Sequence, residues 1–224
     1  MNEKLSIEEI LKFLLVSGDS ARMDVVAELI SLWNSKELPL KNGDRQRNLR
    51  PELLKRLVSL VMTDDERAAY FGLPEGCRMR ENAKIISPEN FECGKHVWVG
   101  EGAVLDASGG LSIGSHTSIG LNVFVWSHTS YLTNLTMNNV SSSDLIQRKK
   151  TTIGSGCFVA GPSVIFHGIT IGDRCMVMPM SVVNKDVPSN SMIGGNPARV
   201  IKAIDDEFIA QRIEELRKPG VNSV

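Results

Sequence analysis

The chain has 224 residues, with 25 Lys+Arg against 26 Asp+Glu, a net charge of -1 and a pI of about 6.4. This balance excludes a general nucleic-acid-binding protein, which needs a basic excess. No apolar stretch is long enough to span a bilayer, and the N-terminus lacks the apolar core of a signal peptide, so we expect no transmembrane segment and a cytoplasmic location. The four cysteines form no CxxC pair, which predicts free thiols and no metal site.

Residues 1–80 are predicted to form a helical N-terminal extension. Apolar residues recur there at helical spacing, and charged residues fill the positions between them. Helix starts and stops are marked by two capping-box pairs, a proline and a glycine: Ser6 with Glu9, Thr63 with Glu66, Pro51 and Gly72. No residue of this extension suggests a chemistry.

A six-residue repeat organises residues 81–203. Aliphatic residues return every six positions along its clearest part, at Ile153, Val159, Ile165, Ile171, Val177 and Val183. A period of six fits neither an amphipathic helix nor simple strand alternation. It fits a solenoid with three short faces and about eighteen residues per coil, in which each aliphatic residue stacks on the one a coil further along. Ile153 is then expected to lie on Ile171.

A second set of positions in the repeat should face the interior. The fourth residue after each aliphatic one is mostly small, which suits a narrow coil. These residues are Ala103, Thr117, Val123, Cys157, Ser163, Cys175 and Ser181. Cys157 and Cys175 share one such position, so we interpret them as core thiols and not as a metal or redox pair.

The repeat stops at Val125 and resumes at Ile153. Residues 129–150 are rich in Ser, Thr and Asn and have no clear periodicity, so they are predicted to form an inserted loop. A loop of this length in a compact solenoid is usually functional or disordered. After the repeat, residues 204–224 are predicted to form an amphipathic C-terminal helix that caps the solenoid. The fold class is therefore mainly β, with a helical flank at each end.

The repeat closes on Gly194-Gly195-Asn196-Pro197-Ala198-Arg199-Val200-Ile201-Lys202. With that ending, residues 83–203 resemble the hexapeptide-repeat acyltransferases, and among them the maltose, galactoside and xenobiotic O-acetyltransferases. The resemblance implies a left-handed parallel β-helix and a homotrimer with active sites in the grooves between subunits. It also implies acetyl-CoA as co-substrate, no metal, and acetylation of a hydroxyl of a sugar or glycan precursor.

His128 is the candidate catalytic residue. It directly precedes the insertion, and by resemblance it matches the catalytic histidine of the sugar acetyltransferases. A neutral imidazole can take the proton of a hydroxyl while its oxygen attacks the thioester carbonyl, so His128 is expected to be the general base. By resemblance the backbone N–H of Gly161 is the oxyanion donor. The chain departs from the family at Phe158, where tryptophan is usual, and at Gly161, where serine is frequent.

Asp106, at a coil corner, is a candidate substrate-binding residue. Its carboxylate can accept a hydrogen bond from a substrate hydroxyl, orient His128, or simply cap the turn. The candidates for binding coenzyme A are corner main-chain groups and, by resemblance, four polar or cationic side chains. They are Ala160, Gly161 and Pro179, followed by Asn184, Lys185, Arg199 and Lys202.

Three other functions compete with O-acetylation. N-acetylation of an amino sugar or small amine would use nearly the same base and donor residues. A zinc hydratase on the same scaffold would need a cluster of histidine ligands, and the sequence lacks the His-x4-His pair typical of one. A non-catalytic scaffold is disfavoured by the long insertion after His128 and by the family-like ending of the repeat.

Overall fold

The computed structural model describes residues 53, 55–137 and 143–218. The chain divides into two compact units, Met1–Val58 and Ser59–Val224, of which the second carries the solenoid. The helices expected before residue 53, together with Ser6, Glu9 and Pro51, lie outside the described residues. So do residues 138–142 of the insertion and residues 219–224 of the expected C-terminal helix.

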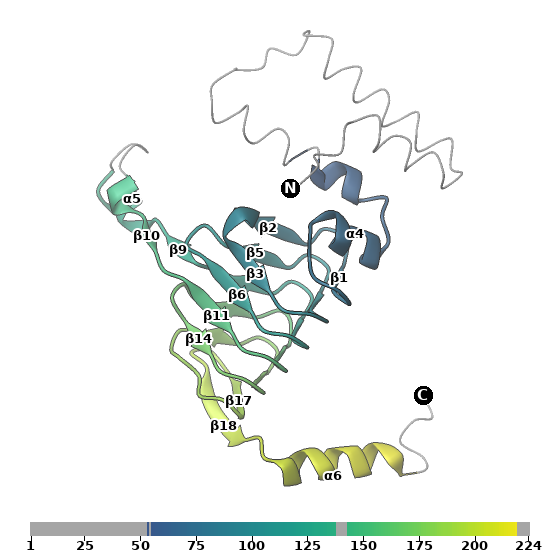
Figure 1. The fold of residues 1–224 in the computed structure, drawn as a ribbon. Helices are drawn as coiled ribbons and strands as arrows, with labels where there is room; N and C mark the ends of the chain where they lie inside the picture. Colours follow the sequence, from purple (N-terminus) through teal and green to yellow (C-terminus); the bar gives the residue numbers. More distant parts are fainter. Residues whose placement is uncertain (1–52, 54, 138–142, 219–224) are drawn as a thin grey trace. The chain divides into compact units, whose positions relative to one another are not determined.

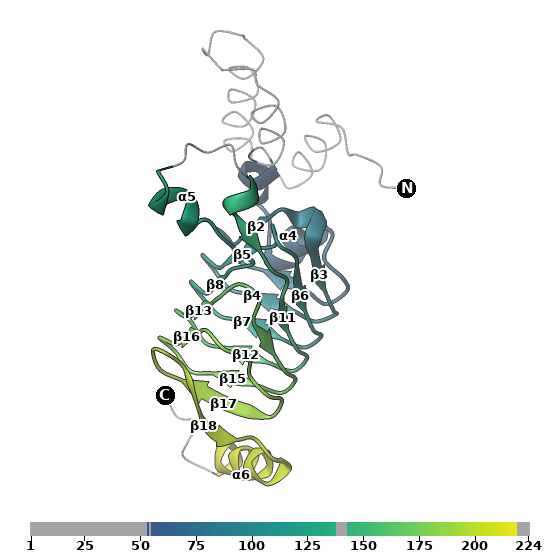
Figure 2. The same ribbon diagram turned by 90° about the vertical axis from the view of Figure 1, so that its left-hand side faces the viewer.

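Three parallel sheets form the solenoid, because each successive coil adds one short strand to each sheet (Figure 1, Figure 2). The seven-stranded sheet contains β1 (Arg78–Met79), β4 (Trp98–Val99), β7 (Ser118–Ile119), β12 (Phe158–Val159), β15 (Met176–Val177), β17 (Ser191–Gly194) and the antiparallel β18 (Arg199–Ala203). The five-stranded sheet contains β2 (Lys84–Ile86), β5 (Val104–Asp106), β8 (Phe124–Val125), β13 (Val164–Ile165) and β16 (Val182–Val183). The four-stranded sheet contains β3 (Phe91–Cys93), β6 (Leu111–Ile113), β11 (Thr151–Ile153) and β14 (Thr170–Ile171).

The strand register confirms the predicted stacking of the repeat. Ile153 pairs with Ile171, and the other two predicted stacks, Val159 on Val177 and Ile165 on Val183, are also ladder partners. The seven small residues assigned to the interior are all buried. The thiols of Cys157 and Cys175 are free and donate to main-chain carbonyls, which fits core cysteines. The prediction of a mainly β, parallel solenoid is therefore confirmed.

The first coils are longer than the predicted eighteen residues. Met79 is the ladder partner of Val99, and Val99 is the partner of Ile119. The first strand, β1, also begins before residue 81, so the expected boundary between the helical extension and the solenoid falls inside the first coil. The physical reason is that Met79 is fully buried and continues the inward row of Val99, although its sequence neighbours carry no recognisable repeat.

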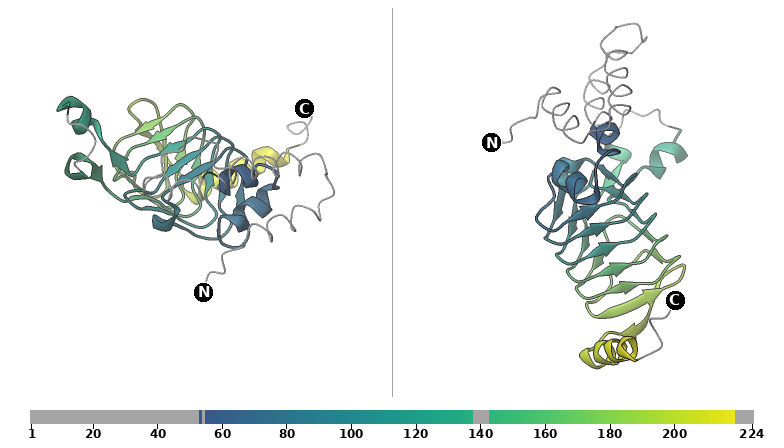
Figure 3. Two further views of the ribbon diagram at one scale, coloured as in Figure 1. Left: turned by 90° about the horizontal axis from the view of Figure 1, so that it is seen from above. Right: turned by 90° about the vertical axis from the view of Figure 1, so that its right-hand side faces the viewer.

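The insertion contains more regular structure than the expected loop. It comprises β9 (His128–Thr129), α5 (Tyr131–Leu135), the 3-10 turn η2 (Ser143–Leu145) and β10 (Gln147–Arg148). β9 and β10 pair antiparallel, and with α5 they project from the side of the stacked coils (Figure 1, Figure 3). The side-chain hydroxyl of Thr151 donates to the carbonyl of Trp126 at 2.6 Å, which closes the base of the insertion.

Helices lie near both ends of the solenoid. α4 (Asp64–Tyr70) begins with the predicted capping box of Thr63 and Glu66 and ends just before Gly72, whose φ is +75°. A single 3-10 turn, η1 (Pro88–Asn90), interrupts the first coil. α6 (Asp206–Arg217) follows β18, and Asp205 caps it by accepting the N–H of Phe208 at 2.7 Å. Arg174 in the solenoid pairs with Asp206 of this helix at 2.6 Å.

Arg67 ties α4 to the first coil. Its side chain is 3% exposed, and its guanidinium donates to the carbonyls of Ser59 (2.9 Å), Met79 (2.7 Å) and Met62. Asp64 lies 3.6 Å from the same group. A rigid, planar donor set is suited to satisfying several carbonyls in one place. Arg67 therefore holds α4 against β1 at the N-terminal end of the solenoid core.

We expect Arg67→Met to destabilise the fold by about 2–4 kcal/mol, because it removes the guanidinium donors to the carbonyls of Ser59, Met62 and Met79, of which the Ser59 carbonyl keeps the N–H of Met62. Arg78→Met is the matched control, since Arg78 is exposed on β1 and should change stability by less than about 0.5 kcal/mol. Urea unfolding, with hydrogen exchange of the α4 and β1 amides, measures both changes. Equal stability of the two variants would contradict this role of Arg67.

Candidate active site

A buried carboxylate holds His128. Asp106 ends β5, and the ladder that pairs Leu105 with Val125 brings it beside the Trp126–His128 turn. The Oδ2 atom of Asp106 lies 2.6 Å from Nδ1 of His128. The aspartate side chain is fully buried, whereas the histidine side chain is 30% exposed. One end of the imidazole is thus anchored in the protein while the ring remains accessible.

The surroundings of Asp106 keep its carboxylate ionised. Oδ2 also accepts the backbone N–H of Ser127 at 2.9 Å and its hydroxyl at 3.2 Å, and Oδ1 accepts the N–H of Ser108 at 3.1 Å. Burial alone would raise the pKa of Asp106, but the hydrogen bonds from Ser127, His128 and Ser108 together lower it below its usual value. An ionised carboxylate only accepts hydrogen bonds, so Nδ1 of His128 carries the proton. The lone pair is therefore on Nε2.

The expectation that Asp106 binds substrate is corrected by this geometry. A fully buried side chain whose two oxygens are occupied by protein donors cannot reach a substrate hydroxyl. Asp106 instead orients His128, and it caps the turn by accepting the N–H of Ser108.

Two serines at the site were not anticipated from the sequence. The hydroxyl of Ser108 lies 2.9 Å from Nδ1 of His128, and the hydroxyl of Ser127 accepts the N–H of Gly109 at 2.8 Å. A side chain at Gly109 would overlap the carbonyl oxygen of Ser127, so this close approach requires glycine. The length of this coil could have indicated the contact, because Ser108 and His128 become neighbours only when the coil has twenty residues.

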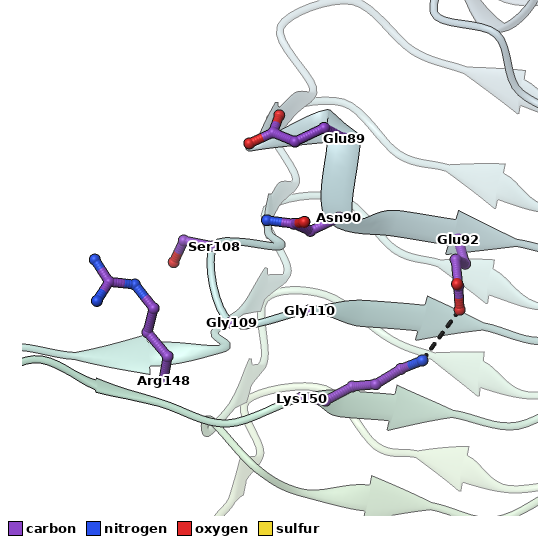
Figure 4. A pocket seen from close by; sticks show the side chains of 8 residues that line it. All are labelled: Glu89, Asn90, Glu92, Ser108, Gly109, Gly110, Arg148 and Lys150. Carbon is purple, nitrogen blue, oxygen red and sulfur yellow. Dashed lines mark hydrogen bonds and ion pairs between the residues drawn. The ribbon is translucent and has the colours of Figure 1, made fainter. Parts of the chain in front are cut away.

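A polar pocket of about 520 Å³ opens beside Ser108 (Figure 4). Its side chains come from η1, β3, the Asp106 turn and the end of the insertion: Glu89, Asn90, Glu92, Ser108, Arg148 and Lys150. Lys150 and Glu92 form an ion pair of 3.0 Å across it. Ser108 contacts the imidazole of His128, and Arg148 is the strand partner of His128, so the pocket is continuous with the histidine site.

The expected donor-binding residues lie at two corners of the solenoid. We call the turns after the five-stranded sheet the histidine corner; they are 106–108, 126–128, 166–168 and 184–186. We call the turns after the seven-stranded sheet the glycine corner; they include Leu121, Gly161 and Pro179. Asn184 and Lys185 share the histidine corner with His128, whereas Ala160, Gly161 and Pro179 lie at the glycine corner. The structure therefore does not bring His128 and Gly161 together within one chain.

The main-chain groups at the glycine corner differ in availability. The N–H of Ala160 donates to the carbonyl of Val177 (2.9 Å), and its carbonyl accepts the hydroxyl of Ser163 (2.7 Å). By contrast, the N–H of Gly161 has no acceptor in the part of the chain that the structure describes. A side chain there would overlap the carbonyl oxygen of Leu121, so glycine is required. An N–H without a protein acceptor, on a half-buried residue of the turn, suits an oxyanion donor.

The two expected cations of β18 are placed differently from each other. The turn before Arg199 bonds to Val182 through Gly195 and Ala198, which sets Arg199 at the glycine corner. Lys202 instead places its ammonium 4.4 Å from the centre of the Phe208 ring on α6, a cation–π contact. Arg199 is thus the better placed of the two for a phosphate at the glycine corner.

No family model matches the chain, but individual proteins do. It is 33% identical over 124 residues to a putative colanic acid biosynthesis acetyltransferase, WcaF of Escherichia coli, which covers 55% of this chain and 64% of the relative. Serine acetyltransferase 2 of Arabidopsis thaliana is 34% identical over 109 residues, covering 49% of this chain and 31% of the relative. The chain thus spans less than two thirds of the length of either relative.

A solved structure extends the likeness to about three quarters of the chain. A hexapeptide-repeat acetyltransferase of Vibrio cholerae, in complex with acetyl coenzyme A, is 26% identical with a TM-score of 0.51. It covers 74% of this chain, and the match spans 92% of its own chain. The sequence and the fold of the chain are thus similar to those of hexapeptide-repeat acetyltransferases.

In this hexapeptide-repeat protein, the described ranges contain no group of three or more metal-ligating side chains. Over the same residues, no helix is both long and apolar enough to cross a membrane. His96 and His116 are not held as His128 is, since they stack on each other with ring centres 4.8 Å apart.

Proposed function

We propose that the protein is an acetyl-CoA-dependent O-acetyltransferase acting on a sugar or glycan precursor. The observation that carries this proposal is the Asp106–His128 pair, which leaves an unprotonated Nε2 on an accessible ring in a chain that is similar to known acetyltransferases. Acetyl coenzyme A in the Vibrio cholerae relative and the name of the colanic acid relative support the donor and the acceptor class.

The proposed reaction needs one base and one oxyanion donor. Nε2 of His128 takes the acceptor's hydroxyl proton while the oxygen attacks the thioester carbonyl carbon. The carbonyl electron pair moves to oxygen, where the Gly161 N–H stabilises the charge. When the tetrahedral species collapses, the carbon–sulfur bond breaks and the imidazolium returns the proton to the leaving thiolate. General-base catalysis of this kind contributes about 10²–10⁴-fold in rate.

A mass-spectrometric assay tests the reaction class. The protein is incubated with acetyl-CoA and matched hydroxyl and amino acceptors, and the products are analysed before and after mild alkali. An alkali-labile ester supports O-acetylation, and an alkali-stable amide replaces it with N-acetylation. Absence of acetyl-CoA binding by calorimetry would leave only a scaffold role.

We further propose that the active unit is a homotrimer. The outer face of the five-stranded sheet carries a row of half-buried apolar side chains: Val104, Phe124, Val164 and Val182. The corresponding row on the four-stranded sheet is polar: Glu92, Ser112, Thr152 and Thr170. An apolar outer sheet face is best covered by a second copy of the chain. Its neighbour's glycine corner can then complete the histidine corner.

Light scattering is expected to give three times the 24.6 kDa chain mass. Val164→Lys places a charge in the apolar row and should yield inactive monomers, because a buried unpaired charge opposes association. Thr152→Lys is the control, since it makes the analogous outward change on the polar sheet and should keep the trimer. A fully active wild-type monomer would contradict the shared site.

A further inference from the structure

We propose that Arg148 recognises an anionic group, a carboxylate or a phosphate, on the acceptor. This inference rests on the proposed function and names the class of acceptor more narrowly. It places a sugar acid or a sugar phosphate in the pocket beside Ser108, with its reacting hydroxyl toward His128.

The first observation is the position of Arg148 relative to His128. In the antiparallel β9–β10 pair, Arg148 is the direct partner of His128. Directly opposed residues of such a pair project to the same face, with Cβ atoms about 4.5–5.5 Å apart. A ligand group held by Arg148 is therefore held within one small sugar's reach of the imidazole.

The second observation is that the guanidinium of Arg148 is not neutralised. Within the described part of the chain it makes no ion pair and no side-chain hydrogen bond, whereas the neighbouring Lys150 is paired with Glu92 at 3.0 Å. In Figure 4 the Arg148 side chain extends into the open side of the pocket, toward Ser108. Arginine offers a planar fork that matches a carboxylate or phosphate with two parallel hydrogen bonds. The unpaired positive charge of Arg148 beside His128 therefore favours binding of an anionic group.

The rest of the pocket suits the hydroxyls of the same ligand. Asn90 and Glu89 lie across the pocket from Arg148, and their side chains point to the same opening (Figure 4). An amide can donate to and accept from hydroxyl groups, and a carboxylate can accept from them. A purely anionic ligand would be repelled by Glu89, so the combination favours a hydroxyl-rich molecule that carries one acidic group.

The same chemistry could belong to a phosphate of the donor. Kinetics separate the two sources, because an arginine that holds the acceptor changes the KM for the acceptor and not that for acetyl-CoA. The probes are glucuronate, galacturonate and glucose 1-phosphate, compared with glucose and galactose. Initial rates are followed by thiol release, and binding of glucuronate to the full chain is measured separately by ligand-observed NMR.

Arg148→Gln is expected to raise the KM for the acidic probes by about 10- to 100-fold, with a much smaller change in kcat and none in the KM for acetyl-CoA. Arg148→Lys should recover part of the loss. Lys149→Gln makes the same charge change one residue further along, but Lys149 packs beside Gly168 outside the pocket, so its KM values should remain those of the wild type.

Three results would overturn the inference. They are a wild-type preference for the neutral sugars, an unchanged acceptor KM in Arg148→Gln, or a raised KM for acetyl-CoA in that variant. If the wild type acetylates none of the probes, the proposed function fails on these acceptors, and the NMR measurement still decides the inference. Glucuronate binding lost in Arg148→Gln but kept in Lys149→Gln supports it, and binding retained in both contradicts it.

Discussion

Replacing His128 with alanine is expected to lower kcat by about 10²–10⁴-fold while the KM for acetyl-CoA stays nearly constant. The reason is that Nε2 is the unprotonated ring nitrogen, since Asp106 fixes the proton on Nδ1 at 2.6 Å. Without it, the acceptor hydroxyl must lose its proton to water as it attacks. The donor contacts proposed at the glycine corner do not involve the imidazole, so donor affinity should survive.

His116→Ala is the matched control for this measurement. His116 is also a corner histidine, but it stacks on His96 and has no part in the Asp106 network. Steady-state kinetics with saturating acetyl-CoA, together with circular dichroism to check folding, compare the two variants. An active His128→Ala enzyme would remove His128 from the role of base, and a loss of activity in His116→Ala would indicate a general effect of removing a corner histidine.

The six-residue period predicted the solenoid well because it reports a repeated physical constraint. Each coil must bury an aliphatic residue at the same three places, so the stacks of Ile153, Val159 and Ile165 could be read from spacing alone. The inward position of Cys157 followed from the same rule. These features depend on nearest-neighbour packing between coils, which a periodic sequence states directly.

The site was harder to predict because it depends on the irregular coils. The eighteen-residue rule does not apply before residue 125, so the approach of Ser108 to His128 was not visible. A carboxylate at a corner can face inward or outward, and only the register showed that Asp106 is fully buried. Arg148 was missed for a related reason, because no periodicity in the insertion indicates that β10 returns to pair with β9.

The position of Gly161 shows a further limit of reasoning from one chain. Sequence resemblance assigned it to the same catalytic centre as His128, yet the strand order places the two at different corners. Both can serve one reaction only if the second corner comes from another copy. The apolar row on the five-stranded sheet provides a physical reason for such an assembly.

Asp106→Asn is expected to lower kcat by about 10²–10⁴-fold, as loss of the orienting carboxylate does in a serine-protease triad. The asparagine amide would present a donor to Nδ1, which favours the proton on Nε2 and removes the lone pair that the mechanism needs. The substitution also weakens the hydrogen-bond network, because Ser127 donates both its N–H and its hydroxyl to one oxygen of the Asp106 carboxylate. Nitrogen NMR of the labelled imidazole reports the tautomer directly, a readout that a merely structural role of Asp106 would leave unchanged.

The pH dependence of stability separates the loss of the Asp106 hydrogen-bond network in Asp106→Asn from the change of the His128 tautomer. Because the folded-state pKa of Asp106 is lower than its ordinary value of 3.8, its ionised form stabilises the fold above that value. This contribution is lost as the pH falls through the lower folded-state pKa. Asp106→Asn should therefore be less stable than the wild type at neutral pH, with the difference shrinking under acid conditions.

Ser108→Ala is the control, because it keeps the Asp106 carboxylate. Its stability should depend on pH in the same direction as that of the wild type, and its kcat should fall by less than about tenfold. Full activity of Asp106→Asn would reduce Asp106 to a turn cap and leave His128 without a defined tautomer.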